Sequence, residues 1–72
     1  MGKAEIGNRI RQLRFEHGEM TQQELADRVG CTRQTIILLE KERYVPSLAL
    51  AMRIGRVFHQ PVESIFERKG RH

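Results

Sequence analysis

A run of four consecutive apolar residues, Ile36-Ile37-Leu38-Leu39, places the strongest constraint on how this chain folds. The run lies in the stretch TRQTIILLEKERYVPS, and the whole chain has only 72 residues. A surface helix in so small a domain buries one apolar stripe and not its whole circumference. At about 100° per residue, Ile36 and Leu39 share one side, which we expect to face the core. Ile37 and Leu38 then point away from the core and need a separate explanation.

The first half of the chain is patterned as short helices separated by turn residues. Residues 3–17 carry apolar side chains at helical spacing, and Gly18 is expected to end that helix. Thr21 and Glu24 have the spacing of a capping box at the start of a second helix. Gly30 is expected to end the second helix, because the left-handed turn required there costs glycine little.

A third helix is expected to follow almost at once, with Thr32 as its N-cap and residue 40 near its end. Two short helices joined by a short turn that contains glycine are the signature of a helix-turn-helix. Pro46 then predicts a loop, and Ser47 is expected to cap a fourth helix over residues 48–58.

Beyond Pro61 a last short helix is expected over residues 62–66. The pattern therefore predicts an all-α fold, a compact five-helix bundle with a short extended segment as an option at its C-terminal end. We expect one domain over residues 1–67, with the helix-turn-helix at about 21–40, and a charged tail over residues 68–72.

Composition narrows the classes of function. The formal net charge is +4, which suits a nucleic-acid partner as well as a basic protein that has no anionic ligand. Cys31 is the only cysteine, and His17, His59 and His72 lack metal-ligand spacing, so we expect no metal, no cofactor and no disulfide. Cys31 is interpreted as a small structural residue, with a redox-sensing thiol as the alternative.

Neither a catalytic constellation nor a membrane segment stands out. No arrangement of nucleophile, base and acid is evident, and so small a chain has little volume for a cleft, so we expect no enzyme and no catalytic residues. No signal peptide or 18-residue apolar run is present, which favours a cytoplasmic protein with no membrane partner.

The outward side of the third helix carries Gln34, Ile37, Leu38 and Lys41, with Arg33 at its edge. This mixture is unusual for a solvated face but suits the DNA major groove. There arginine binds guanine, glutamine binds adenine, and aliphatic groups contact thymine methyls. The alternative for Ile37 and Leu38 is burial against the fourth helix, the C-terminal segment or a second subunit.

The stretch MTQQELADRVGCTRQTIILLEKERYVPSLALAMRIGRVFHQPVESIF resembles the Cro/cI-type (XRE-family) helix-turn-helix DNA-binding domain. The resemblance lies in the T-Q-x-E-L-A opening, the G-x-T-R-Q-T-I turn, the L-E helix end, the P-S cap and the final I-F, in order. It implies a phage-repressor-like bundle whose third helix enters the major groove of double-stranded DNA. It also implies a homodimeric transcriptional repressor that binds an inverted-repeat operator.

The resemblance also assigns residues to roles. It implies that Gln22 contacts phosphate and that Arg14 pairs with Glu40 to tie the first helix to the end of the third. The full expected DNA-binding set is Gln22, Thr32, Arg33, Gln34, Thr35, Ile37, Leu38, Lys41, Arg43 and Tyr44. The expected dimer interface is Val62, Ile65 and Phe66, with the alternative that these three residues cap the core.

The chain also departs from the family pattern. Ile37 and Leu38 replace polar or small residues, which leads us to expect a T-rich half-site. The residues EM make the loop before Thr21 one residue longer, and KERY replaces the frequent N-G-K turn. An antitoxin-like or protein-interaction module that binds DNA only with a partner protein remains the alternative function. Ile37 and Leu38 would then be partner contacts.

Overall fold

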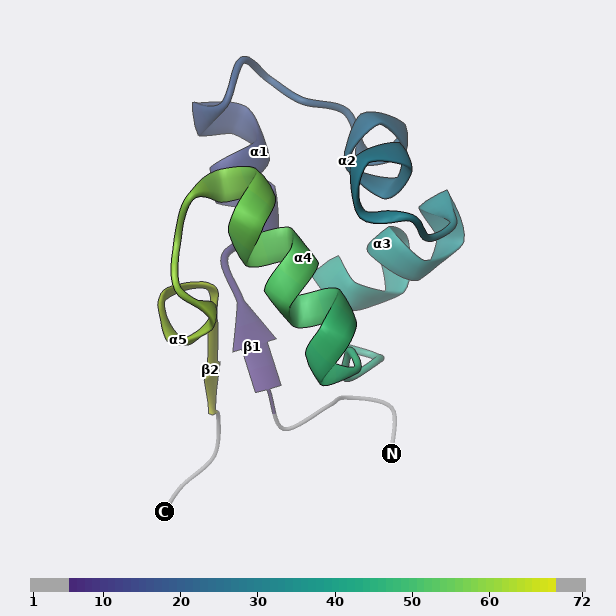
Figure 1. The fold of residues 1–72 in the computed structure, drawn as a ribbon. Helices are drawn as coiled ribbons and strands as arrows, with labels where there is room; N and C mark the ends of the chain where they lie inside the picture. Colours follow the sequence, from purple (N-terminus) through teal and green to yellow (C-terminus); the bar gives the residue numbers. More distant parts are fainter. Residues whose placement is uncertain (1–5, 69–72) are drawn as a thin grey trace.

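The computed structural model describes residues 6–68, which form a small helical bundle with a two-stranded sheet at one end (Figure 1). In chain order the elements are β1 (Ile6–Asn8), α1 (Ile10–Glu16), α2 (Gln22–Val29), α3 (Arg33–Glu40), α4 (Leu48–Phe58), α5 (Val62–Ile65) and β2 (Phe66–Arg68). Helices α2 and α3 pack on each other, while α4 packs on α2 and on α5. The helical fold with a short extended end confirms the predicted class.

The core is built from one apolar face of each of the four longer helices. Ile36 and Leu39 are fully buried, which confirms the side of α3 that the helical spacing assigned to the core. The buried cluster comprises Ile10, Leu13, Met20, Leu25, Ala26, Val29, Ile36, Leu39, Leu50, Ile54, Phe58 and Ile65. Because this cluster contacts both α2 and α3, the helix-turn-helix cannot shift without disturbing the packing of the whole domain.

Capping residues set the bounds of α2. The Thr21 hydroxyl accepts the Glu24 N–H at 3.0 Å, and the Glu24 carboxylate accepts the Thr21 N–H at 2.8 Å. Gly30 ends the helix in the left-handed region with φ 74°, and its N–H donates to the Ala26 carbonyl. The predicted capping box and the predicted glycine stop are both confirmed.

The caps of the next two helices are confirmed as well. Thr32 accepts the Thr35 N–H at 3.2 Å, and Ser47 accepts the Leu50 N–H at 3.1 Å. Each interaction satisfies a backbone donor that the first turn of a helix leaves without an intrahelical partner. Helix α2 ends at Val29 and the N-cap of α3 is Thr32. Only Gly30 and Cys31 lie between them.

The prediction that the first helix begins at residue 3 is wrong for the described part of the chain. Ile6–Asn8 is a strand, and α1 begins only at Ile10. The Asn8 side chain accepts the Ile10 N–H at 3.1 Å and donates to the Leu39 carbonyl at 2.8 Å. This side chain favours the break because it satisfies a backbone donor at the start of α1 and a carbonyl near the end of α3. Residues 3–5 of the predicted helix lie outside the described residues.

The strand at the N-terminal end forms because the C-terminal end supplies a partner. β1 and β2 are antiparallel, with Ile6 opposite Arg68 and Asn8 opposite Phe66. α5 therefore ends at Ile65, one residue earlier than predicted, and Phe66 begins β2. Arg68, the first residue of the predicted tail, belongs to β2, while residues 69–72 lie outside the described part of the chain.

Residues 6–68 contain neither a candidate membrane-spanning helix nor a candidate metal cluster. No helix there is long and apolar enough to cross a membrane. Nor does this part of the chain contain a group of three or more His, Cys, Asp or Glu residues that could hold a metal ion.

Candidate nucleic-acid interface

A buried ion pair joins α1 to the end of α3. The guanidinium of Arg14 donates to both carboxylate oxygens of Glu40, from Nε at 2.7 Å and from Nη2 at 3.0 Å. Its Nη1 donates to the Met20 carbonyl at 2.7 Å. The two charged side chains are only 9% and 10% exposed, so this bidentate pair is largely shielded from water. The predicted partners thus lie together.

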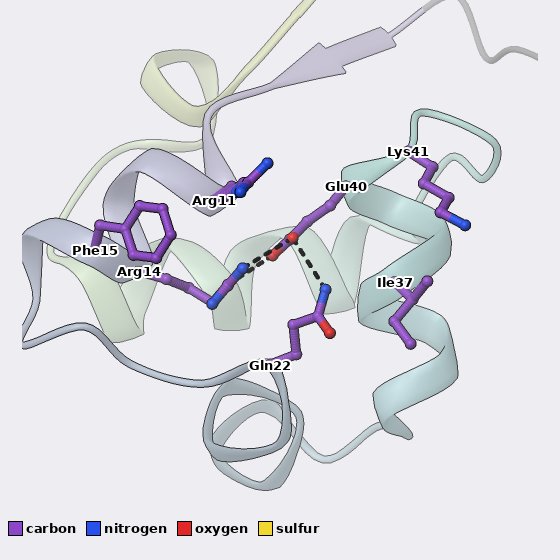
Figure 2. Close-up of a pocket in the computed structure, with 7 residues that line it drawn as sticks. All are labelled: Arg11, Arg14, Phe15, Gln22, Ile37, Glu40 and Lys41. Atoms are coloured by element: carbon purple, nitrogen blue, oxygen red, sulfur yellow. Dashed lines mark hydrogen bonds and ion pairs between the residues drawn. The ribbon is translucent and has the colours of Figure 1, made fainter.

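Gln22, the first residue of α2, joins the same network. Its Nε2 donates to Glu40 Oε1 at 3.2 Å, as Figure 2 shows. A glutamine predicted to contact phosphate is therefore held in place by a carboxylate and does not move freely. The side chains of Arg14, Gln22 and Glu40 tie together α1, the beginning of α2 and the end of α3, the three helix segments that border the outward face of the helix-turn-helix.

These three helices also line a hollow on the surface (Figure 2). Its walls are formed by Arg11, Arg14, Phe15, Gln22, Ile37, Glu40 and Lys41. The guanidinium carbons of Arg11 and Arg14 each lie 5.6 Å from the centre of the Phe15 ring, within the range of cation–π attraction. Phe15 is 52% exposed, so a large part of its ring stays open to a ligand.

Arg11 is a candidate site residue that the sequence analysis missed. The signal was present, because Arg11 precedes Arg14 by three residues on the same helix and so lies on the same face. Once Arg14 was expected to reach the end of the third helix, Arg11 could have been placed beside it. Arg11 adds a cation to a hollow that already contains Gln22 and Lys41.

The first turn of α3 presents two free side chains. Arg33 and Gln34 are exposed, and neither side chain forms a hydrogen bond within the described part of the chain. The hydroxyls of Thr32 and Thr35, by contrast, lie 3.0 Å apart and bond to each other. Arg33 and Gln34 can therefore reach outward, while the two threonines hold the start of the helix that carries them.

Ile37 and Leu38, which helical spacing turns away from the core, are half-buried. Ile37 lines the same hollow as Gln22 and Lys41, and Leu38 lies beside it on α3. Neither belongs to the buried core cluster, unlike Ile36. Ile37 thus lies among polar and cationic side chains on the outward side of the helix-turn-helix. A ligand that occupied this hollow would contact it.

The loop after α3 presents further exposed side chains. Lys41 and Arg43 are exposed cations, and Tyr44 is exposed next to them. Glu42 takes a left-handed backbone conformation with φ 60°, and the Arg43 N–H donates to the Leu38 carbonyl at 2.9 Å. The sequence KERY, which replaces the frequent N-G-K turn, therefore still forms a turn and keeps positive charges at its surface.

The three residues predicted at a dimer interface do not share one environment. Val62 and Phe66 are half-buried and line an apolar hollow together with Ile6, Val45, Pro46, Leu48 and Ala51. Ile65 is only 1% exposed and belongs to the core cluster. Its place within a single chain fits the alternative that it caps the core, so an interface here depends on Val62 and Phe66.

Cys31 has the environment of a structural residue. It is half-buried, packs against the core cluster, and its thiol lies 3.5 Å from the Thr32 carbonyl oxygen. Burial raises the pKa of the Cys31 thiol, opposed by the positive charge of Arg53. A raised pKa keeps the thiol protonated at neutral pH, where the thiolate is the reactive form. The structure therefore favours the structural interpretation of this cysteine.

Comparison with known proteins agrees with this arrangement. Residues 10–65 match the helix-turn-helix family model, a span that includes α1 to α5. An HTH-type transcriptional regulator of Archaeoglobus fulgidus is 53% identical over 58 residues, which cover 81% of this chain and 81% of the relative. Another, from Methanothermobacter thermautotrophicus, is 60% identical over 58 residues and covers 79% of this chain and 83% of the relative.

A solved structure shares the fold. The crystal structure of a candidate DNA-binding protein from Bacteroides fragilis superposes with a TM-score of 0.74 at 21% sequence identity. The match covers 86% of this chain and 98% of the other. At that identity the likeness establishes the arrangement of the elements, and the side chains of the interface have to be judged from this chain alone.

Proposed function

The chain belongs to the XRE-type helix-turn-helix family of DNA-binding transcriptional regulators, and on that premise we propose that it is a repressor that binds an inverted-repeat operator as a homodimer. In this proposal α3 enters the major groove of double-stranded DNA, and α2 crosses the backbone. The observation that carries the proposal is the first turn of α3. Arg33 and Gln34 point outward there without a partner in the described part of the chain, on a helix fixed from behind by the core.

The proposed contacts divide into two kinds. Arg33, Gln34 and Ile37 are assigned to base edges, because guanidinium, amide and aliphatic groups match guanine, adenine and the thymine methyl respectively. Leu38 adds apolar surface beside Ile37. In the apolar run over residues 36–39, Ile36 and Leu39 are therefore assigned to the core, and Ile37 and Leu38 to the groove.

The phosphate contacts are assigned to the borders of the recognition helix. Gln22 is held by Glu40 at the beginning of α2, where free N–H groups and the helix dipole favour an anion. Lys41, Arg43 and Tyr44 follow α3, and Arg11 of α1 lines the same hollow as Lys41. Such contacts set the register and orientation on the duplex but carry no direct sequence information. Thr32 and Thr35 complete the set at the start of α3.

A homodimer is supported by the apolar hollow around Val62 and Phe66. The exposed rim includes Leu48, which is 71% exposed, and Val45, which is 53% exposed. A contiguous apolar surface that includes side chains this open favours burial against a partner, and a second copy offers the same surface. A two-fold dimer would place the two α3 helices about 34 Å apart, which is one turn of DNA.

Two variants test the proposal, one at a residue assigned to a base contact and one at a residue assigned to a phosphate contact. Gln34→Ala is expected to weaken binding to an operator selected from random-sequence duplexes by about 1–3 kcal/mol and to relax the preference at one base pair. Arg43→Ala is expected to weaken binding to all sequences alike and to lower the slope of log K against log salt by about one. The assay is fluorescence anisotropy on the operator and on substituted duplexes over a salt series. If both variants change only the sequence preference, the division into base and phosphate contacts is wrong.

A further inference from the structure

Three arginines meet in a hollow on a different part of the molecule. The hollow has a volume of about 200 Å³ and is lined by Arg28 of α2 and by Arg53, Arg56 and Val57 of α4. None of these residues belongs to the proposed DNA interface. The cluster is also separate from the apolar hollow around Leu48, with which it shares no residue.

The positive charge of this cluster is not balanced within the described residues. None of the guanidiniums of Arg28, Arg53 and Arg56 has a carboxylate within 4 Å there. The acidic side chains of α2 are occupied elsewhere, because Asp27 accepts from Gln23 and Glu24 accepts the Thr21 N–H. Like charges at such spacing on one helix repel each other, as Arg53 and Arg56 do on α4. An anion bound among the three arginines would remove that repulsion.

One of the three arginines is connected to the helix-turn-helix. The Nε of Arg53 donates to the Val29 carbonyl at 2.8 Å. Val29 is the last residue of α2, and Gly30 and Cys31 lead from it to the N-cap of α3. Arg53 therefore holds the carbonyl from which the turn ahead of the proposed recognition helix begins.

We propose that Arg28, Arg53 and Arg56 form a binding site for a phosphate group, which acts on the turn before α3 through Arg53. Guanidinium forks match the spacing of phosphate oxygens and bind them through paired N–H donors. The phosphate can be free, or it can be the monoester of a small molecule whose carbon portion contacts Val57. Because the N–H groups of Arg53 would then serve both the anion and the Val29 carbonyl, occupancy of the site changes how firmly the turn is held.

The test uses the full chain without DNA, so that its outcome does not depend on the proposed function. Inorganic phosphate is titrated at constant ionic strength, with chloride as the replaced anion, and the ¹H–¹⁵N resonances of the backbone and of arginine Nε are recorded. We expect a saturable shift of the Arg53 Nε–H resonance together with the backbone amides of residues 29–32. A parallel titration with glycerol phosphate separates the two sources. Tighter binding than inorganic phosphate identifies a monoester ligand, and equal or weaker binding identifies the free ion.

Variants make the proposal refutable. Arg28→Gln and Arg56→Gln are each expected to weaken phosphate binding about tenfold, since each removes a charged pair of donors. Arg68→Gln, at an exposed arginine in β2, is the matched control and is expected to leave the affinity unchanged. A shift that never saturates, or one that Arg28→Gln and Arg56→Gln leave intact, would mean ionic screening only and would overturn the site. Saturable binding that leaves the amides of residues 29–32 unmoved would overturn the link to the turn.

Discussion

Replacing Arg14 by methionine removes the centre of the network that fixes the helix-turn-helix. The variant keeps most of the side-chain volume but leaves the Glu40 carboxylate, 10% exposed, without its guanidinium partner. Breaking a buried ion pair from one side costs about 3–5 kcal/mol, because an uncompensated charge stays in the interior. A domain of this length has a free energy of unfolding of roughly 4–11 kcal/mol, so the variant is expected to lose a large part of its stability.

The double variant Arg14→Met with Glu40→Met distinguishes the contribution of the ion pair to stability from that of the other contacts of Arg14. Removing both charges eliminates the buried carboxylate, and such replacements by apolar residues are often neutral or stabilising. The Met20 carbonyl still loses the donor that Arg14 Nη1 supplies at 2.7 Å. An unsatisfied buried acceptor costs about 1–3 kcal/mol. We therefore expect the double variant to lose about 1–3 kcal/mol, which is less than Arg14→Met alone.

The assay is urea denaturation followed by circular dichroism, with an osmolyte added to restore a folded baseline for the weakest variant. Arg33→Met, at an exposed arginine without a partner in the described part of the chain, is the control and is expected to change stability by less than about 0.5 kcal/mol. The single variant Glu40→Met is measured as well. If the double variant loses the sum of the losses of Arg14→Met and Glu40→Met, the two groups do not act as a pair and the reasoning is refuted. A loss below about 1 kcal/mol for Arg14→Met would equally contradict it.

Four further predictions concern other parts of the molecule. Gly55→Ala should lower the free energy of unfolding by about 1–3 kcal/mol in urea denaturation, since its Cβ would lie 2.7 Å from the Gln60 carbonyl oxygen; an unchanged value would contradict this close contact. His59→Gly should raise thermal stability by up to about 1 kcal/mol, because His59 ends α4 at φ 56°, and a loss would refute the assigned strain. Leu48→Asp should give a monomer in sedimentation equilibrium if the apolar hollow forms the dimer, and a persistent dimer would place the interface elsewhere. Arg11→Gln should lower the salt slope of DNA binding by about one; an unchanged slope would remove Arg11 from the phosphate contacts.

The parts of the fold that the sequence predicted are those fixed by local chemistry. Thr21, Glu24, Gly30, Thr32 and Ser47 each act within four residues of themselves, through a cap or a left-handed turn. Such interactions depend little on the remainder of the chain, so spacing and residue type are enough to identify them. The side of α3 that faces the core could also be predicted, because the helical spacing of Ile36 and Leu39 depends only on neighbouring residues.

The parts that the sequence did not predict depend on distant partners. Residues 6–8 form a strand only because residues 66–68 pair with them, and Asn8 also holds the Leu39 carbonyl at the end of α3. A three-residue strand is too short to display an alternating pattern, and the helical spacing of the apolar side chains over residues 3–17 predicts a helix there instead. The sequence leaves two places open for Ile65, a dimer interface or the core, because its burial against the core depends on the whole bundle.

The candidate interface was predicted in part. The pairing of Arg14 with Glu40 and the outward position of Gln34 followed from the family resemblance and from helical geometry. That Gln22 shares the Glu40 carboxylate was beyond the reach of spacing, because the two residues come from different helices. Arg11 was missed although its position relative to Arg14 was sufficient to place it. The arginine hollow between α2 and α4 required the packing of two helices and left no local signal.

We propose above all that this chain, without a partner protein, recognises an inverted repeat in double-stranded DNA. The most direct measurement is a binding selection in which the purified protein is incubated with a pool of random-sequence duplexes at near-physiological salt, and the retained DNA is sequenced. We expect an enriched inverted repeat with half-sites about one helical turn apart and thymine among the contacted positions. Binding that depends on salt but enriches no sequence would contradict the claim and would direct the search to a protein partner.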